Sequence, residues 1–439
     1  MYLDITSIDT GLKDESFRYE LYKGTTKVKE GNFSDSYLTS NTVTCTKNNT
    51  NHIVLLTNES ISTSKTSYTL YIWINGVNYT NPNTMMNKTF SFKLHADGEG
   101  AVMKGYTAAD YITDLYTEAA KVTATNNSIT YNTAPSVSLM NDRLGGTTTD
   151  LDGGNIRYYG ANPNNYIYFN CSDYSNQTSS TCETWRIIGV FDGKLKLIRG
   201  SQIGKYSWDN KNTSTGAEND AGKNDWTTAR LMKLLNPRDY YKVDSNDNNL
   251  GQSLYYNSAS GKCYSGQNNA TVDCDFTSTG IKNAETRNMI AETTYNLGGW
   301  NSNSVYSNQI YEYERGTTVY IGRPTTWQGK IALPYPSDYG YAADLGKCNQ
   351  TLKNYNNSTC TSNNWMKTIV NNGSNSNGWL LTHDSNTSYN AWFVFSSGYV
   401  YNYYNAYSAH VVAPVLSLRS ELNIKAGTGS SSAPYQLSI

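Results

Sequence analysis

The sequence predicts an all-β sandwich over residues 1–104 and a larger α+β domain over residues 156–439. Three observations support this division. Short apolar runs separated by polar turns fill the first hundred residues, whereas runs with helical periodicity follow residue 105. Six of the seven cysteines lie beyond residue 170, where they form close pairs. Between the two domains, residues 105–155 are expected to form a helix and a linker.

The first domain is predicted from strand-like runs that alternate with polar turns. These runs are Phe17–Tyr22, His52–Thr57, Ser67–Ile74 and Thr89–His95. The third run has a period of two, and the Asn75–Gly76 pair after it is a strong turn signal. Several short strands at this spacing favour an immunoglobulin-like sandwich. Cys45 lies in another strand-like stretch, and we expect it to be a buried free thiol.

A helix is expected at Ala108–Ala120, because its apolar residues recur at i, i+4 and i+8 and Thr107 is a suitable N-cap. The stretch that follows, Gly145–Asn155, is rich in Gly, Thr and Asp. Such a composition is typical of a loop. We therefore place the main domain boundary there.

The second domain is expected to contain strands, three helices and long loops. Its first strands are Tyr166–Asn170, Thr184–Val190 and Lys194–Ile198. The expected helices, the first of which is stopped by a proline, are Asp225–Leu235, Asn283–Asn296 and Trp365–Val370. Buried strands near the C-terminus are Gly378–Thr382, Ala391–Phe395 and Ala413–Leu418.

The composition excludes several classes of function. The formal net charge is −1 and charged residues make up 16% of the chain, against about a quarter in ordinary proteins. No strong charge field would attract nucleic acid or an anionic membrane. No apolar run reaches the roughly 18 residues of a membrane span. We therefore expect no nucleic-acid partner and no membrane insertion by this chain.

Six cysteines form three pairs that would each close a short loop rich in Asn, Ser and Thr. The pairs are Cys171 and Cys182, Cys263 and Cys274, and Cys348 and Cys360. Sequence does not fix the connectivity, but local pairing is the simplest arrangement. Zinc is the rival interpretation, and the Cys-x2-Cys spacing with nearby histidines that it needs is missing. Disulfides imply an extracellular protein, and we expect attachment to a cell surface through a segment outside this chain.

No catalytic or metal-binding motif is evident. None of the four histidines lies in a two-histidine metal motif or beside a cysteine nucleophile. The segment Asp244–Asn248 resembles the start of a calcium loop, but Asn249 and Tyr255 stand where Gly and Glu are needed. The segment Asp150–Gly154 is interpreted in the same way, and we expect a solvated turn rather than a calcium site at both segments. We therefore expect a binding protein that has no enzymatic activity, cofactor or metal.

The segment Tyr389–His410 is rich in tyrosine and asparagine. Five tyrosines fall within the nine positions 399–407, too many for the single inward face of one strand, so some must be exposed. Tyr, Ser, Gly and Asn are the residue types of recognition surfaces, because Tyr offers a large contact area at low entropic cost. No Lys or Arg lies between Tyr389 and Leu418, which argues against single-stranded nucleic acid.

Several motifs after Tyr159 match one family in order. They are Ala161–Tyr166, Trp185–Gly189, Asn224–Leu231, Pro336–Ala342, Gly378–Leu381, Pro414–Leu418 and Gly427–Ser430. With these motifs the chain resembles the C-type-lectin-fold domains of bacterial surface proteins, including the variable proteins of diversity-generating retroelements. The resemblance implies a C-type lectin fold of the variant that formylglycine-generating enzymes share. Where the family often has Arg before its final Pro, this chain has Ala413, which weakens the match there.

In that family, error-prone reverse transcription changes Asn codons of the form AAY to NNY. Such codons cannot encode Lys, Glu, Gln, Met or Trp, and Trp392 is the only one of these within residues 383–410. The resemblance makes Trp379, Trp392, Val400 and Pro414 scaffold residues. It implies a diversified, ligand-facing set that binds a protein or glycan on another cell or a phage: His383, Asp384, Tyr389, Phe395, Tyr399, Tyr401, Asn402, Tyr403, Tyr404, Ala406, Tyr407, Ala409 and His410.

Two alternatives remain. A formylglycine-generating enzyme needs reactive cysteines late in the domain, and no cysteine follows Cys360. A fixed adhesin or carbohydrate-binding lectin would stack its aromatic rings on sugars. The Glu-Pro-Asn and Gln-Pro-Asp motifs of calcium-dependent lectins are absent from the sequence, so that binding would not need calcium.

Overall fold

The computed structural model describes residues 1–44, 51–57, 67–79, 82–95, 106–147, 153–217, 219–242, 250–371 and 376–438. It divides into two compact units, Met1–Lys104 and Gly105–Ile439. Strands account for 34% of the chain and helices for 18%, so the protein is β-rich with few helices, as expected. Cys45, the calcium-like segment Asp244–Asn248 and most of Asp150–Gly154 lie outside the described residues.

The smaller unit contains two antiparallel sheets around one apolar core. One sheet has the strand order β4 (Thr42–Thr44), β5 (Asn51–Val54), β1 (Tyr2–Ile8), β7 (Phe90–His95). The other has the order β3 (Thr26–Asn32), β2 (Phe17–Lys23), β6 (Tyr68–Ile74). Both sheets contribute residues that are 0% exposed, such as Leu3 and Tyr19. A short helix, α1 (Asp35–Asn41), follows β3 and begins at Ser34, whose side chain accepts a hydrogen bond from the Tyr37 N–H.

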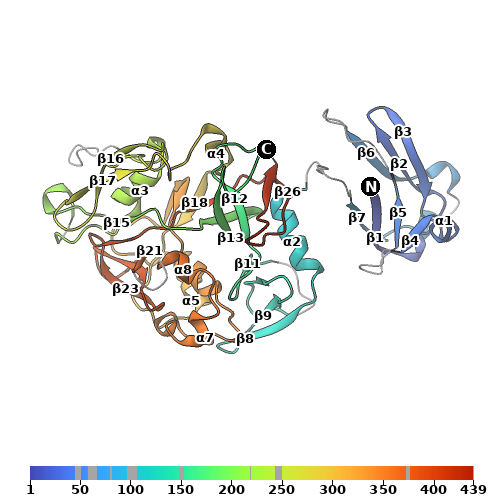
Figure 1. Cartoon of the computed structure of the whole chain (residues 1–439). Helices are drawn as coiled ribbons and strands as arrows, with labels where there is room; N and C mark the ends of the chain where they lie inside the picture. Colours follow the sequence, from blue (N-terminus) through green and yellow to red (C-terminus); the bar gives the residue numbers. More distant parts are fainter. Residues whose placement is uncertain are drawn as a thin grey trace. The chain divides into compact units, whose positions relative to one another are not determined.

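The larger unit is built on an antiparallel sheet that runs through its centre (Figure 1). Its strand order is β20 (Ile331–Ala332), β25 (Val415–Ser417), β14 (Lys194–Arg199), β13 (Glu183–Phe191), β11 (Ile156–Tyr158), β10 (Leu139–Asn141), β9 (Ile129–Ala134), β8 (Val122–Asn126), and β12 (Tyr166–Phe169) also pairs with β13. The segment expected to be a linker therefore supplies β8, β9 and β10. These strands were not expected because polar residues such as Asn126, Asn132 and Thr133 are usually exposed in loops. Here they are at most 4% exposed. The Asn126 Nδ2 donates to the Leu345 and Cys348 carbonyls, which satisfies its polar group inside the fold.

One predicted helix is confirmed almost to its ends. Helix α2 (Ala108–Glu118) begins at Thr107, whose side chain and that of Asp110 each accept a hydrogen bond from the other residue's backbone N–H. Its buried face includes Ile112 and Tyr116. In Figure 1 α2 lies beside β13 and β26 (Asn423–Ala426), with which it is in contact.

The other predicted helices are shorter than expected. Helix α3 (Arg230–Leu235) is separated from its expected start by a 3-10 turn, and α8 is limited to Lys367–Val370. Helix α4 (Ala284–Met289) is capped by Asn283, the first residue of the expected helix, but Thr293–Asn296 forms strand β18, paired with β19 (Thr326–Gly329). The β-branched and aromatic residues of β18 suit a strand better than a helix. Helices α5 (Ser307–Glu314), α6 (Pro336–Tyr341) and α7 (Ser358–Thr361) were not predicted.

All three predicted disulfides are confirmed. They join Cys171 to Cys182, Cys263 to Cys274 and Cys348 to Cys360. The disulfide between Cys263 and Cys274 links the two strands of the hairpin formed by β16 (Ser260–Tyr264) and β17 (Thr271–Asp275). Three disulfides fit an extracellular protein. Among the described residues, no helix is both long enough and apolar enough to span a membrane.

A second, five-stranded sheet carries the tyrosine-rich segment. Its order is β15 (Lys205–Ser207), β24 (Ala409–Val411), β21 (Gly378–His383), β22 (Asn390–Val394), β23 (Val400–Asn405). The central strands β21 and β22 are buried along their whole length. Strand β23 lies at the edge of this sheet, and in Figure 1 it is found at the outer side of the larger unit.

Candidate ligand-binding surface

Two apolar cores pack against opposite faces of the strands that adjoin the tyrosine-rich strand. Successive residues of β21 and β22 point to opposite faces, so Trp379 and Phe393 join one core while Leu380 and Trp392 join the other. Trp379, Trp392 and Val400, which the sequence assigned to the scaffold, are each at most 1% exposed. The edge strand therefore rests on a well-packed base.

A β-bulge sets the direction of the tyrosines on β23. Ala391 pairs with Tyr404 and Phe393 pairs with Tyr401, so two residues of β23 stand opposite one residue of β22. Because of this extra residue, Tyr401 and Tyr404 lie on the same face of the sheet although they are three positions apart. Both rings meet Phe393 edge-on, at centroid distances of 5.8 and 4.9 Å.

The exposed rings lie on β23 and on the residues that flank it. Tyr401, Tyr403 and Tyr404 are 37%, 52% and 36% exposed. Phe395 stacks on Tyr399 at 4.9 Å, and Tyr399 meets Tyr401 edge-on at 6.2 Å. Burial raises the pKa of Tyr389, and a hydrogen bond with Tyr403 raises it further. We call this set the tyrosine face: Tyr389, Phe395, Tyr399, Tyr401, Tyr403 and Tyr404.

Five of the residues expected to face a ligand are buried instead. They are between 0% and 7% exposed: His383, Asp384, Asn402, Ala406 and His410. Tyr407 and Ala409, from the same expected set, are half-buried. The prediction that these five residues face a ligand is wrong, because their side chains are buried inside the domain. A pattern of residue types does not show which side chains are buried.

Asp384 and Asn402 form a buried polar pair under the tyrosine face. The Asn402 Nδ2 donates to the Asp384 Oδ2 at 2.8 Å. The other carboxylate oxygen accepts the backbone N–H groups of Asn386 and Thr387 at 2.8 and 3.0 Å. Burial raises the pKa of Asp384, while these hydrogen bonds act to lower it. The pair ties the bulge of β23 to the loop that precedes β22.

The two buried histidines are neutral. Burial lowers the pKa of both His383 and His410 to about 4. The His383 Nε2 accepts the Tyr320 N–H at 3.4 Å. The His410 ring stacks on Phe393 at 5.3 Å and contacts Trp379 at 4.5 Å. Both rings thus belong to the support of the tyrosine face.

Two residues far away in the sequence hold the loop 384–390. The Asn224 Nδ2 lies within hydrogen-bonding distance of three of its carbonyls, at 2.7 to 3.1 Å. The Arg323 Nε donates to the Asn224 Oδ1 at 3.0 Å, and its Nη2 donates to the Ser388 carbonyl at 2.9 Å. Asn224 begins one of the segments on which the lectin resemblance rests, but no pattern in the sequence identifies Arg323.

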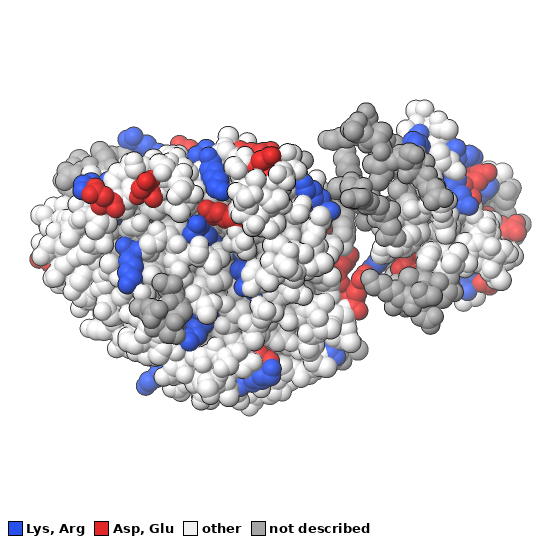
Figure 2. All heavy atoms as spheres, in the orientation of Figure 1, with Lys and Arg blue, Asp and Glu red and all other residues white. Residues whose placement is uncertain are grey.

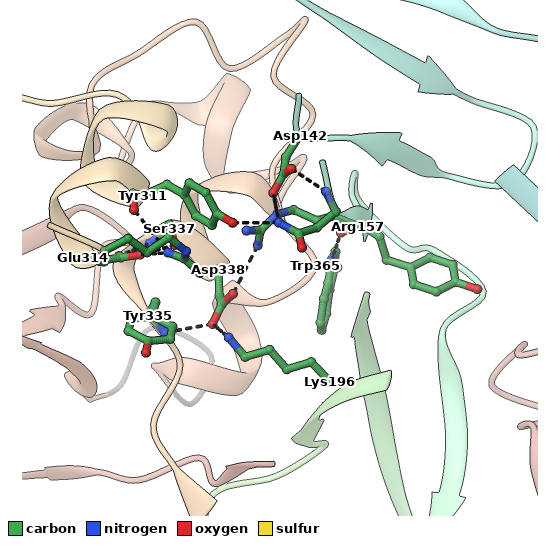
Figure 3. Close-up of polar contacts among 12 residues, drawn as sticks. Asp142, Arg157, Lys196, Tyr311, Glu314, Tyr335, Ser337, Asp338 and Trp365 are labelled. Atoms are coloured by element: carbon green, nitrogen blue, oxygen red, sulfur yellow. Dashed lines mark hydrogen bonds and ion pairs between the residues drawn. The ribbon is translucent and has the colours of Figure 1, made fainter. Parts of the chain in front are cut away.

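A buried network of charges is the other cluster that could carry chemistry (Figure 3). The Arg157 Nε contacts the Asp142 carboxylate at 2.6 Å, and Asp338 lies between Arg157 at 3.2 Å and Lys196 at 2.5 Å. Burial raises the pKa of Asp338, but the two cations lower it more, so that it lies below its usual range. These charged groups are at most 7% exposed. The network therefore joins α6 to β11 and β14, and its charged groups are almost fully buried.

Nearby, Glu314 is also buried, and burial raises its pKa to about 7. Its carboxylate accepts hydrogen bonds from the Ser337 N–H and hydroxyl. It is 0% exposed, so it cannot reach a substrate. Within the described part of the chain, no group of three or more His, Cys, Asp or Glu side chains is arranged to hold a metal ion.

The tyrosine face is uncharged. Residues 385–418 contain no Asp, Glu, Lys or Arg. Figure 2 shows charged side chains as scattered spots on a largely uncharged surface of the larger unit. Comparisons of the chain with protein families, with curated proteins and with solved structures found no match.

Proposed function

We propose that this protein is an extracellular, cell-surface binding protein that captures a protein or glycan ligand on its tyrosine face. One observation carries the proposal. Three exposed tyrosines lie within four positions of a bulged edge strand, and the strand next to it is buried along its whole length. Three titratable residues near these tyrosines, His383, Asp384 and His410, are buried and belong to the support rather than to the surface.

The fold part of the proposal is a C-type lectin domain preceded by an immunoglobulin-like sandwich. Strands β13 and β14 share a sheet with β25 near the C-terminus, and Tyr435 bridges to Ile167 of β12. The two ends of this domain are thus joined, and the tyrosine-rich sheet is formed in the long excursion between β14 and β25. The two sheets around one core in the smaller unit support the sandwich.

The physical basis for binding is preorganised aromatic area. A tyrosine brings a large apolar surface and a hydroxyl at the cost of two side-chain torsions. Phe393 already restrains Tyr401 and Tyr404 through edge-on contacts. Less side-chain entropy is then lost when a ligand binds.

Diversification by a retroelement is proposed only for the exposed part of the segment. Under this proposal Tyr389, Tyr401, Tyr403 and Tyr404 change between copies, whereas Asp384 and Asn402 are retained because they tie the bulge to the loop. A nearby reverse transcriptase gene and a template repeat that matches residues 379–415 except at adenines would support it. A genome without that repeat would refute diversification and leave a fixed adhesin or calcium-independent lectin as the second candidate.

Alanine substitution tests the binding surface directly. We expect the triple variant Tyr401→Ala, Tyr403→Ala, Tyr404→Ala to lose at least tenfold in affinity for binders selected on the wild type from a glycan array and a random-peptide phage library. The control is Tyr71→Ala, a tyrosine that is 54% exposed on β6 of the smaller unit. Unchanged affinity in the triple variant would refute the proposal. Glycan binding that survives EDTA would favour the lectin candidate.

A further inference from the structure

A tight turn beside the tyrosine face presents an isoleucine to solvent. The Arg323 N–H donates to the Tyr320 carbonyl at 3.0 Å and closes the turn. Gly322, the third residue, has φ +79°, which is the conformation that a type II turn requires of glycine at this position. Ile321 at the apex is 82% exposed, more than any other large apolar side chain described in the larger unit.

The turn is fixed to the segment that carries the tyrosine face. The Arg323 side chain is bonded to the Ser388 carbonyl at 2.9 Å and to Asn224 at 3.0 Å, and Arg323 is only 8% exposed. The Tyr320 N–H donates to His383, at the other end of the same loop. Ser388 directly precedes Tyr389, the first residue of the tyrosine face. Ile321 is thus held beside that face by contacts that do not involve its own side chain.

We propose that Ile321 is a fixed apolar anchor of the ligand-binding surface and that the ligand is a protein with an apolar pocket. This inference rests on the proposed function of the tyrosine face. A single exposed aliphatic residue is common on protein surfaces, but this one is rigidly held at the margin of an aromatic surface. An exposed apolar side chain that enters a pocket of the partner is removed from water, and this burial favours binding.

The chemistry of the anchor distinguishes a protein from a glycan. Sugars are bound by hydrogen bonds and by stacking of their C–H faces on aromatic rings, as the tyrosines alone could do. The Ile321 side chain offers neither a ring nor a hydrogen-bonding group. Its burial is favourable only against apolar atoms, and residues 385–418 add no charge that would recruit a charged partner.

The test uses the intact chain and a phage-displayed library of random peptides as the probe. Clones enriched on the immobilised wild type are measured on Ile321→Ser, Tyr403→Ala, the triple tyrosine variant and a control, Val272→Ser. Val272 is 40% exposed on β17, in a hairpin stapled by a disulfide. We expect these clones to bind the control like the wild type and to lose at least tenfold on Ile321→Ser. Equal tryptophan fluorescence of the variants checks their folding.

The outcomes separate the two proposals. Clones that bind Ile321→Ser within threefold of the wild type but lose affinity for Tyr403→Ala would overturn the anchor and leave the tyrosine face standing. Loss on Ile321→Ser with no loss on the triple variant Tyr401→Ala, Tyr403→Ala, Tyr404→Ala would refute the tyrosine face, and with it the role of Ile321 as an anchor of that face. A library without any wild-type binder, or glycan-array binding that Ile321→Ser leaves unchanged, would also overturn the protein ligand.

Discussion

Substitution of Asn402 tests whether a residue of the tyrosine-rich segment supports the fold or contacts the ligand. Asn402 was expected to face a ligand, yet it is 7% exposed and donates to the Asp384 carboxylate at 2.8 Å. Asn402→Ala removes this donor, so the Oδ2 atom of the buried Asp384 carboxylate loses the hydrogen bond that it accepts from Asn402. A hydrogen bond to a charged group contributes roughly 1.5–3 kcal/mol. We therefore expect the free energy of unfolding to fall by about 2 kcal/mol.

Urea unfolding followed by tryptophan fluorescence measures this change, because eight of the nine tryptophans follow residue 105 and report on the larger unit. Loss of the donor should raise the pKa of Asp384 beyond the increase that burial already causes. A carboxyl whose pKa is raised by folding is destabilising above that pKa, and this penalty disappears as the pH falls through it. The effect of Asn402→Ala should therefore shrink in acid.

The control is the neighbouring Tyr403→Ala, which removes a side chain that is 52% exposed. We expect it to cost less than about 1 kcal/mol, in the range of surface substitutions rather than of core truncations. A double-mutant cycle with Asp384→Ala should give a coupling energy above about 0.5 kcal/mol for Asn402. An Asn402→Ala variant with unchanged stability and lost ligand binding would refute the reasoning and return Asn402 to the binding surface.

Two further predictions concern buried titratable groups in the larger unit. Folding lowers the pKa of His410 to about 4, so its contribution to stability is complete above the unfolded pKa of about 6.5 and is lost between there and about 4, by roughly 3 kcal/mol. His410→Phe should therefore flatten the fall in unfolding free energy between pH 7 and pH 4, and an unchanged slope would contradict this. Asp338→Asn leaves Arg157 and Lys196 buried without their shared carboxylate, which should cost about 3–5 kcal/mol in urea unfolding; a loss below about 1 kcal/mol would show that the network contributes little.

Much of the fold could be predicted because its strands alternate and its helix is capped. The strand β6 and the helix α2 follow from local pattern alone. The strands β8 to β10 could not be predicted, since a buried asparagine such as Asn126, satisfied by two distant carbonyls, looks like a loop residue in the sequence. The segment Thr293–Asn296 looked like the end of a helix, and pairing with β19 made it a strand.

The candidate site could be predicted in outline only. Counting tyrosines required that some be exposed, and Tyr401, Tyr403 and Tyr404 are. Which neighbours are buried depends on the bulge, which changes the face of every residue after it. The hydrogen bond from Arg323 to the Ser388 carbonyl joins residues that are far apart in the sequence, so no local pattern could identify it.

In a variable binding site, the residues that change must be different from the residues that stabilise the fold. Domains are stable by only about 5–15 kcal/mol, so a position whose side chain contributes several kcal/mol cannot change freely. On β23 the bulge directs Asn402 inward to Asp384 and leaves the adjacent Tyr403 half exposed. Residues next to each other in the chain thus differ in how much stability depends on them. If the tyrosine face varies between copies, its exposed positions should vary one by one, while the inward positions of the same strand stay fixed.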